Sequence, residues 1–241
     1  MRAASAIPEV SVACPLCGGR GPTFYVENGR RFERCPCGLV FQNPRPTDAW
    51  LQAARYEPYD RGAAHGREMR AIYEHAASVL PPGRLLDVGC GPGLFVRMMR
   101  SRGWDAEGID LDRGEDFLRL DLEGPFDALT AIYVLEHVAD PRRFVEKARR
   151  LLRPGGMLYV RVPHTAPIVR IGKLLAPRWN FFHTPWHLQD FPPRVLLGLL
   201  GGWTLRIDRT PTRRGAWARL PVPGRSYTVM ATRPMYNAQP P

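Results

Sequence analysis

The stretch that decides the fold is residues 85–93, which reads Leu-Leu-Asp-Val-Gly-Cys-Gly-Pro-Gly. A short apolar run interrupted by Asp87 is typical of a buried strand, and Gly89, Gly91 and Gly93 then allow the backbone to approach a ligand closely. A helix that begins at Leu94 would direct its unpaired N–H groups at an anionic group. The stretch therefore predicts a strand, a ligand-binding turn and a helix.

An acidic residue follows this turn at the sequence spacing that is typical of a ribose-binding carboxylate. Asp110 ends a second strand, Gly-Ile-Asp at 108–110, about 20 residues after the first glycine, where a carboxylate can accept hydrogen bonds from both ribose hydroxyls. The alternative is a solvated Asp at a strand end. Turn and acid together indicate a nucleoside cofactor, and a nicotinamide dinucleotide would fit them as well as a methyl donor.

Strand and helix patterns alternate from residue 84 onward, which predicts an α/β fold with a doubly wound, mostly parallel, seven-stranded sheet. We expect three parts: a module at 1–46, a connecting helical segment at 47–82 and the main domain at 83–241. The expected strands are 85–88, 105–109, one near 117–120, 127–132, 157–162, 203–208 and 227–231, and the expected helices of the main domain are 94–102 and 141–152.

Four segments, residues 86–93, 108–112, 126–130 and 151–158, closely resemble consecutive motifs of class I S-adenosylmethionine-dependent methyltransferases, in their order and spacing. The resemblance covers roughly residues 80–210 and implies a Rossmann-like methyltransferase that uses S-adenosylmethionine. It implies that the glycine turn binds the methionine part of the cofactor and that Asp110 binds the ribose. It further implies that Asp87 faces the ammonium, Asp121 and Leu122 lie beside the adenine, and Tyr133 lies at the cofactor edge.

One departure from the family pattern concerns the adenine contact. The stretch between Asp110 and Asp121 is so short that the usual third helix must be very short or missing.

Methyl transfer from a sulfonium is a direct displacement, so the enzyme must align a nucleophile and, where necessary, remove its proton. The candidate catalytic residues are Glu136, His137 and His187, with His164 and His183 as further possible bases. The Leu-Glu-His-Val segment at 135–138 resembles a motif of small-molecule methyltransferases, and residues 183–188 resemble a substrate-side segment. The alternative for each histidine is a packing or loop-bonding role.

Four cysteines lie in the first forty residues as a C-x-x-C pair and a C-x-C pair, and they are Cys14, Cys17, Cys35 and Cys37. Four thiolates can close a tetrahedral site, so the module is a candidate zinc ribbon with a structural Zn²⁺, and it resembles the N-terminal ribbon of some bacterial small-molecule methyltransferases. The short second pair could strain the fourth bond. The alternative is four reduced, free cysteines.

Several features of the sequence bear on the class of the methyl acceptor. We expect a small molecule, such as a sugar, a lipid or a secondary-metabolite intermediate, and residues 167–176 suit an amphipathic lid or ordinary core packing. The net charge of +11 and the basic runs at 142–153 and 206–225 keep an RNA methyltransferase as an alternative, and a non-catalytic cofactor-binding protein is a third. The lack of an Asx-Pro-Pro-aromatic sequence at 131–135 disfavours methylation of nucleobase nitrogens.

The sequence has no apolar stretch of membrane-spanning length, and we expect a cytoplasmic protein. It makes no prediction of the oligomeric state.

Overall fold

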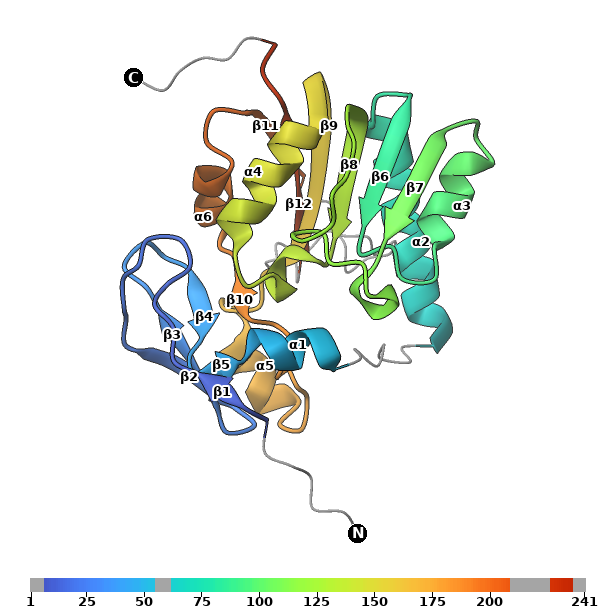
Figure 1. Ribbon diagram of the computed structural model, residues 1–241. Coiled ribbons are helices and arrows are strands. Elements are labelled where there is room, and N and C mark those ends of the chain that lie inside the picture. The colour runs from blue at the N-terminus through green and yellow to red at the C-terminus, as the bar shows by residue number, and fades with distance from the viewer. Residues whose placement is uncertain (1–6, 55–61, 209–225, 236–241) are drawn as a thin grey trace.

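The computed structural model describes residues 7–54, 62–208 and 226–235. Its main sheet has the strand order β11-β12-β9-β8-β6-β7 (Figure 1). The four strands β6, β8, β9 and β7 run parallel, β12 runs antiparallel to β9, and β11 runs antiparallel to β12. Their bounds are β6 (Arg84–Val88), β7 (Asp105–Ile109), β8 (Phe126–Ile132), β9 (Leu152–Pro163), β11 (Thr204–Asp208) and β12 (Ser226–Thr232).

Helices cover both faces of this sheet, as the doubly wound pattern predicted. Strand residues alternate between the faces, so Leu85 packs with α2 and α3, whereas Leu86 packs with α4 and α6. The bounds of the helices are α2 (Gly62–Val79), α3 (Leu94–Arg100), α4 (Pro141–Leu151) and α6 (Pro193–Leu199). Figure 1 shows α4 and α6 on one side of the strands and α2 and α3 on the other.

The strand predicted near 117–120 is wrong. Between β7 and β8 the chain forms the 3-10 helix η1 (Leu111–Arg113) and then turns. The apolar side chains that suggested a strand are used for packing instead: Phe117 is buried, with its ring centroid 4.6 Å from that of Phe144 on α4. The main sheet therefore has six strands in the described part of the chain, not seven.

Three N-terminal strands form a second, smaller sheet with the order β10-β4-β3-β2, and β1 and β5 pair with each other in a separate two-stranded sheet. Strand β10 comes from the C-terminal half and pairs with β4, so the module is completed by a segment far away in sequence. The bounds are β1 (Glu9–Val10), β2 (Thr23–Glu27), β3 (Arg30–Arg34), β4 (Val40–Gln42), β5 (Arg45–Pro46) and β10 (Gln189–Asp190). The division at residues 46 and 82 stays a prediction.

The expected connecting segment contains α1 (Asp48–Ala53) and α2, and its residues 55–61 lie outside the described residues. Between β9 and β10 lie α5 (Val169–Leu175) and a loop that runs to residue 188. Among the described residues, no helix combines the length and the apolar character that crossing a membrane requires.

Candidate active site

A cavity of about 930 Å³ opens at one edge of the main sheet. The last residues of the four parallel strands all line it, namely Val88, Ile109, Ile132 and Pro163. Because parallel strands point the same way, their carboxyl ends meet at one edge, which is where open α/β sheets bind ligands. The cavity therefore lies where the sequence predicted a cofactor.

The glycine turn forms part of the cavity wall. Gly89, Gly91 and Gly93 have φ angles of 72°, 50° and 75°, a region that residues with a Cβ rarely adopt. A Cβ on Gly89 would lie 2.4 Å from Cγ2 of Val134, whereas a Cβ on Gly91 would meet nothing within 4 Å. Gly89 and Gly91 line the cavity, and Gly93 precedes α3 without lining it. The open backbone at Gly91 is where a ligand can approach closely.

Asp110 lies at the cavity wall beside this turn. Its Oδ2 accepts a hydrogen bond from the backbone N–H of Gly91 at 2.6 Å, and its Oδ1 accepts one from the N–H of Asp112 at 2.9 Å. Two amides thus hold the carboxylate in place, and each oxygen keeps a lone pair for a further donor. This arrangement suits the predicted contact with ribose hydroxyls.

Asp87, the residue expected to face the cofactor ammonium, lies in β6 one residue before the end of the strand. It is buried, does not line the cavity, and accepts a hydrogen bond from Oγ1 of Thr130 at 2.6 Å. Burial disfavours the charged form and raises the pKa of Asp87 to about 7. The strand alternation that turns Leu85 into the core on the α2 and α3 side turns Asp87 the same way. The contact between Asp87 and a cofactor ammonium stays a prediction.

The residues expected to contact adenine follow a turn that lines the cavity. Asp121 and Leu122 do not line the cavity, whereas residues 116–119 do. With no third helix between β7 and β8, the turn at 116–120 places Phe117 and Leu118 at the wall. The apolar surface beside Asp110 therefore comes from residues a few positions earlier than the family pattern implies.

Tyr133 lines the cavity as predicted, and its hydroxyl belongs to a buried network that sequence reasoning missed. The hydroxyl donates to Oγ of Ser226 at 3.0 Å and accepts from Nε of Arg161 at 3.1 Å. Arg161 is buried and also donates to Ser226 and Thr228. A charged residue inside the apolar strand 157–162 was a signal that could have identified this network.

Glu136, His137 and His187, three candidate catalytic residues from two separate segments of the sequence, come together in the cavity. One ligand atom from each lies within 4.8 Å of the others, and Glu136 and His187 are buried. The segment follows β8 as the 3-10 helix η2 (Leu135–His137). A carboxylate with two imidazoles can accept protons, orient a hydroxyl or hold a divalent cation.

The protonation state of His137 follows from its surroundings. Its Nδ1 lies 3.0 Å from the carbonyl oxygen of Trp186, which can only accept, so Nδ1 carries the proton and Nε2 is the acceptor. Burial lowers the pKa of His137 to about 4. The imidazole is therefore neutral at pH 7.

The opposite wall of the cavity is built by residues from 163 to 187. Trp186 lines it and packs its ring against Trp50 on α1, with centroids 5.1 Å apart, and His183 stacks on His187. His164, considered above as a base, does not line the cavity and instead places Nδ1 3.1 Å from Oδ1 of Asp190. This wall is rich in aromatic and imidazole rings, which suits a flat or apolar acceptor.

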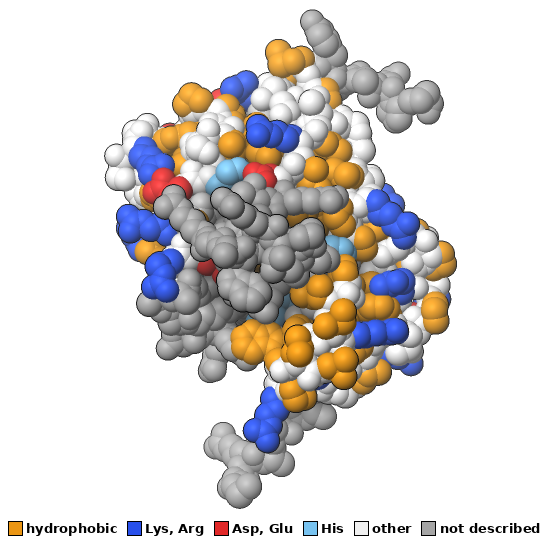
Figure 2. Space-filling model, turned by 180° about the vertical axis from the view of Figure 1, so that it is seen from behind, with side chains coloured by type: hydrophobic (Ala, Val, Ile, Leu, Met, Phe, Trp, Pro, Cys, Tyr) orange, Lys and Arg blue, Asp and Glu red, His pale blue; other side chains and the backbone are white. Residues whose placement is uncertain are grey.

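Helix α5 borders this wall, with Val169 buried in a small core cluster and the outer face of the helix exposed. Ile168 lines the cavity, whereas Ile171, Leu174 and Leu175 are 65%, 84% and 83% exposed. Apolar side chains gather on the surface at this end of the molecule when it is seen from behind (Figure 2). Core packing, one of the two expectations for residues 167–176, is therefore wrong for the outer face of α5.

The four cysteines of the N-terminal module converge. Sγ of Cys14 lies 3.6 Å from Sγ of Cys37, Sγ of Cys17 lies 3.3 Å from Sγ of Cys35, and all four lie within 4.8 Å of one another. Zn–S bonds of about 2.3 Å in a tetrahedron place sulfurs about 3.8 Å apart, so these thiols fit a zinc ion. The C-x-C spacing of the second pair is compatible with this convergence.

Comparisons with known proteins identify the family of the chain. A family model described as a methyltransferase domain matches residues 59–200, more than half of the chain. The Ubiquinone biosynthesis O-methyltransferase of Dechloromonas aromatica is 33% identical over 150 residues, 53% of this chain and 65% of the relative. That of Pseudomonas aeruginosa is 25% identical over 143 residues, 50% of this chain and 62% of the relative. The alignments thus span less than two thirds of these relatives.

A solved structure shares the fold. A SAM dependent methyltransferase from Archaeoglobus fulgidus superposes with a TM-score of 0.53 at 16% identity, over 73% of this chain and 97% of that one. The resemblance read from the sequence motifs is thereby confirmed for the fold. With the match of the family model, this shows that the chain belongs to the family of proteins with a methyltransferase domain.

Proposed function

We propose that this protein transfers a methyl group from S-adenosylmethionine to a hydroxyl of a small-molecule acceptor. The observation that carries the proposal is one cavity with two different walls: the glycine turn and Asp110 on one side, and Glu136, His137 and His187 on the other. The family match and the names of the O-methyltransferase relatives support the reaction type.

Different residues of the cavity hold the cofactor and the acceptor. S-adenosylmethionine supplies an electrophilic methyl group on a sulfonium. The open backbone at Gly91 admits the methionine part, Asp110 binds the ribose hydroxyls, and Phe117 contacts the adenine. At the other wall, the carboxylate of Glu136 accepts the hydrogen bond of the acceptor hydroxyl and takes its proton as the oxygen–methyl bond forms and the sulfur–methyl bond breaks, which leaves S-adenosylhomocysteine. His137 and His187 lie beside Glu136 and border the acceptor.

The RNA alternative rests on two basic runs, and the structure describes the first of them, on α4. Four of the basic side chains on α4 donate hydrogen bonds to backbone carbonyls of the same molecule, which ties them to the fold. They are Arg142, Arg143, Lys147 and Arg149, bonded to Leu16, Leu118, Leu120 and Gly201. Most of the second basic run, residues 209–225, lies outside the described residues.

A labelled-methyl transfer assay tests the proposal. The protein and S-adenosylmethionine with a labelled methyl group are incubated in two separate reactions. One reaction contains a small-metabolite fraction from the source cell, and the other contains an RNA fraction. We expect label in the small-metabolite fraction and none in RNA. Label in RNA alone, with affinity that falls steeply as salt rises, would establish the alternative. Cofactor binding without transfer to either fraction would indicate a non-catalytic binding protein.

We also propose that the four cysteines bind a structural Zn²⁺. Four thiolates leave no open coordination position, so the ion would hold the module together without taking part in methyl transfer. The N–H of Gly19 and the neighbouring thiol of Cys35 lower the pKa of Cys17 to about 7, which eases formation of the thiolate. A cytoplasmic location, where such thiols stay reduced, remains a prediction.

A further inference from the structure

We propose that Glu27, the last residue of β2, is a positioning residue that fixes the acceptor-side wall of the cavity. The wall segment is residues 179–188, which no sequence motif connects to the N-terminal module. The inference rests on the proposed function for its effect on catalysis, whereas its structural part can be tested without any acceptor.

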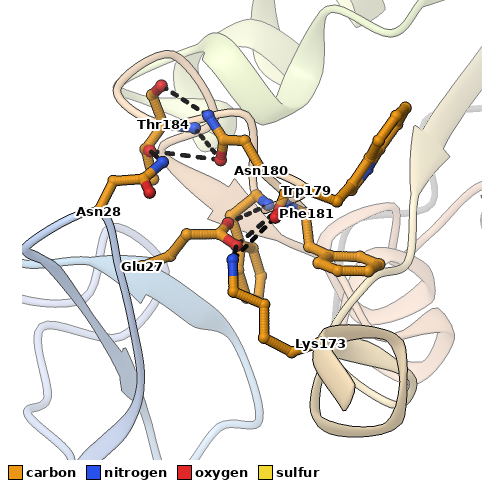
Figure 3. Close-up of polar contacts among 8 residues, drawn as sticks. Glu27, Asn28, Lys173, Trp179, Asn180, Phe181 and Thr184 are labelled. Carbon is orange, nitrogen blue, oxygen red and sulfur yellow. Dashed lines mark hydrogen bonds and ion pairs between the residues drawn. The ribbon is translucent and has the colours of Figure 1, made fainter. Parts of the chain in front are cut away.

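The contacts of Glu27 are those of a buried anchor. Its side chain is buried, and its two oxygens accept hydrogen bonds from the backbone N–H groups of Phe181 at 3.0 Å and Phe182 at 2.6 Å. Nζ of Lys173 lies 3.1 Å from Oε1 (Figure 3). A buried carboxylate is costly unless it is paired and hydrogen-bonded, and here every partner comes from the segment 173–182. Glu27 therefore ties the module to that segment.

Further contacts hold residues 182–188 against the N-terminal module. Nδ2 of Asn28 donates to Oγ1 of Thr184 at 3.1 Å, and the ring of Phe182 stacks on Phe32 of β3 with centroids 4.2 Å apart. At the end of the loop, the N–H of Gln42 donates to the carbonyl of Leu188 at 2.8 Å. Figure 3 shows Glu27 and Asn28 reaching from the hairpin toward the loop.

The anchored loop carries the acceptor wall into the cavity. Between residues 182 and 188 the chain has no helix or strand, so the positions of its side chains depend on these ties and on the contacts of Trp186 and Leu188 with η2. The residues that it places at the cavity are Trp179, Phe181, His183, Trp186 and His187. The partners of Glu27 lie outside the glycine turn and Asp110. Loosening Glu27 should thus disturb the acceptor wall and spare the cofactor wall.

Hydrogen exchange followed by mass spectrometry tests this on the full chain, with Glu27→Gln compared with Glu33→Gln. The glutamine side chain turns an NH₂ toward one of the two amides, so one bond is lost. Glu33 is a matched control, because it is also buried, on the adjacent strand β3, and accepts from Nδ2 of Asn43 within the module at 2.8 Å. We expect exchange in peptides covering 179–188 to rise about tenfold in Glu27→Gln only, with peptides covering 84–100 unchanged.

An equal rise in both variants, or none in either, would overturn the proposal. If Glu27→Gln does not fold, Asn28→Gly takes its place, since glycine accepts the φ of 50° at this position and removes only the bond to Thr184. A smaller rise confined to 179–188 is then expected, and unchanged exchange there would contradict the inference.

The catalytic consequence is measured with the small-metabolite fraction as the acceptor probe. For Glu27→Gln we expect the amount of fraction that gives half-maximal methyl transfer to rise about tenfold. The affinity for S-adenosylhomocysteine should equal that of wild type. Failure of wild type to transfer methyl to any acceptor would refute the proposed function and leave the exchange result to decide the positioning role. An unchanged half-maximal amount in an active Glu27→Gln protein would refute that role in acceptor binding.

Discussion

The two walls of the cavity are built in different ways. The cofactor wall comes from the carboxyl ends of neighbouring parallel strands, where the turn after β6 meets Asp110 after β7. The acceptor wall combines η2, which carries Glu136 and His137, with a loop whose backbone is held by Glu27, 154 residues from Phe181 in sequence. A cofactor site can thus follow from the local strand and turn pattern, whereas the acceptor site depends on a second module. Changes on each wall should therefore separate cofactor binding from acceptor use.

The largest effect is expected on the acceptor wall from Glu136→Gln. If Glu136 takes the proton of the acceptor, the maximal rate of methyl transfer should fall by about 10²–10⁴-fold. The affinity for S-adenosylhomocysteine, measured by calorimetry, should stay the same because Asp110 and the glycine turn are intact. A variant that keeps its full rate would show that Glu136 is not the base.

Loss of the zinc site should come next. Cys17→Ser removes one of four thiolate ligands, and we expect the purified protein to fall from about one zinc per chain to far less, as measured by elemental analysis. Because the module anchors the acceptor wall, methyl transfer should fall while S-adenosylhomocysteine still binds. The buried Cys90, which lies in the glycine turn, provides the control: Cys90→Ser should keep its zinc. Wild-type protein without zinc would contradict the metal assignment.

On the cofactor wall, Asp110→Ala should weaken S-adenosylhomocysteine binding by about 1 to 3 kcal/mol, because it removes charged hydrogen bonds to the ribose. Asp121→Ala is the matched control, since Asp121 does not line the cavity. Calorimetric titration of both variants checks the pair. Equal affinities would show that Asp110 does not hold the ribose, and a loss for Asp121→Ala would restore the adenine contact that the family pattern implies.

The smallest effect concerns pH and the buried Asp87. Its pKa of about 7 in the folded chain lies above the ordinary value, so the native state binds more protons than the unfolded state between about pH 4 and 7. The contribution of Asp87 to the free energy of unfolding therefore falls as pH rises through this range. Asp87→Asn should lose this dependence and keep the bond from Thr130. Denaturant unfolding at pH 4.5 and 7.5 measures the difference, and identical pH profiles for the two proteins would contradict the assignment.

The sequence predicted the cofactor wall better than the acceptor wall for physical reasons. Strand alternation and glycine turns are local, so the doubly wound sheet and the position of Asp110 could be read directly. Local pattern failed at residues 117–120, where apolar side chains pack against Phe144 instead of forming a strand.

Contacts between segments far apart in the sequence could not be predicted from the spacing of residues. The buried network of Arg161 and Ser226 joins β9 to β12, and the anchoring of residues 181–182 by Glu27 joins the two modules. In both sets of contacts, a charged residue of a strand bonds to groups that are far away in the sequence. The meeting of Glu136 with His187 was foreseen only as a list of candidates, since their proximity depends on the loop that Glu27 holds.

A crystal structure with S-adenosylhomocysteine bound tests the division into two walls most directly. We predict that its ribose hydroxyls contact the carboxylate of Asp110, that its methionine part lies along residues 89–91, and that its sulfur faces the cluster of Glu136, His137 and His187. A ligand bound away from Asp110, or one whose sulfur turns away from that cluster, would contradict the proposed arrangement.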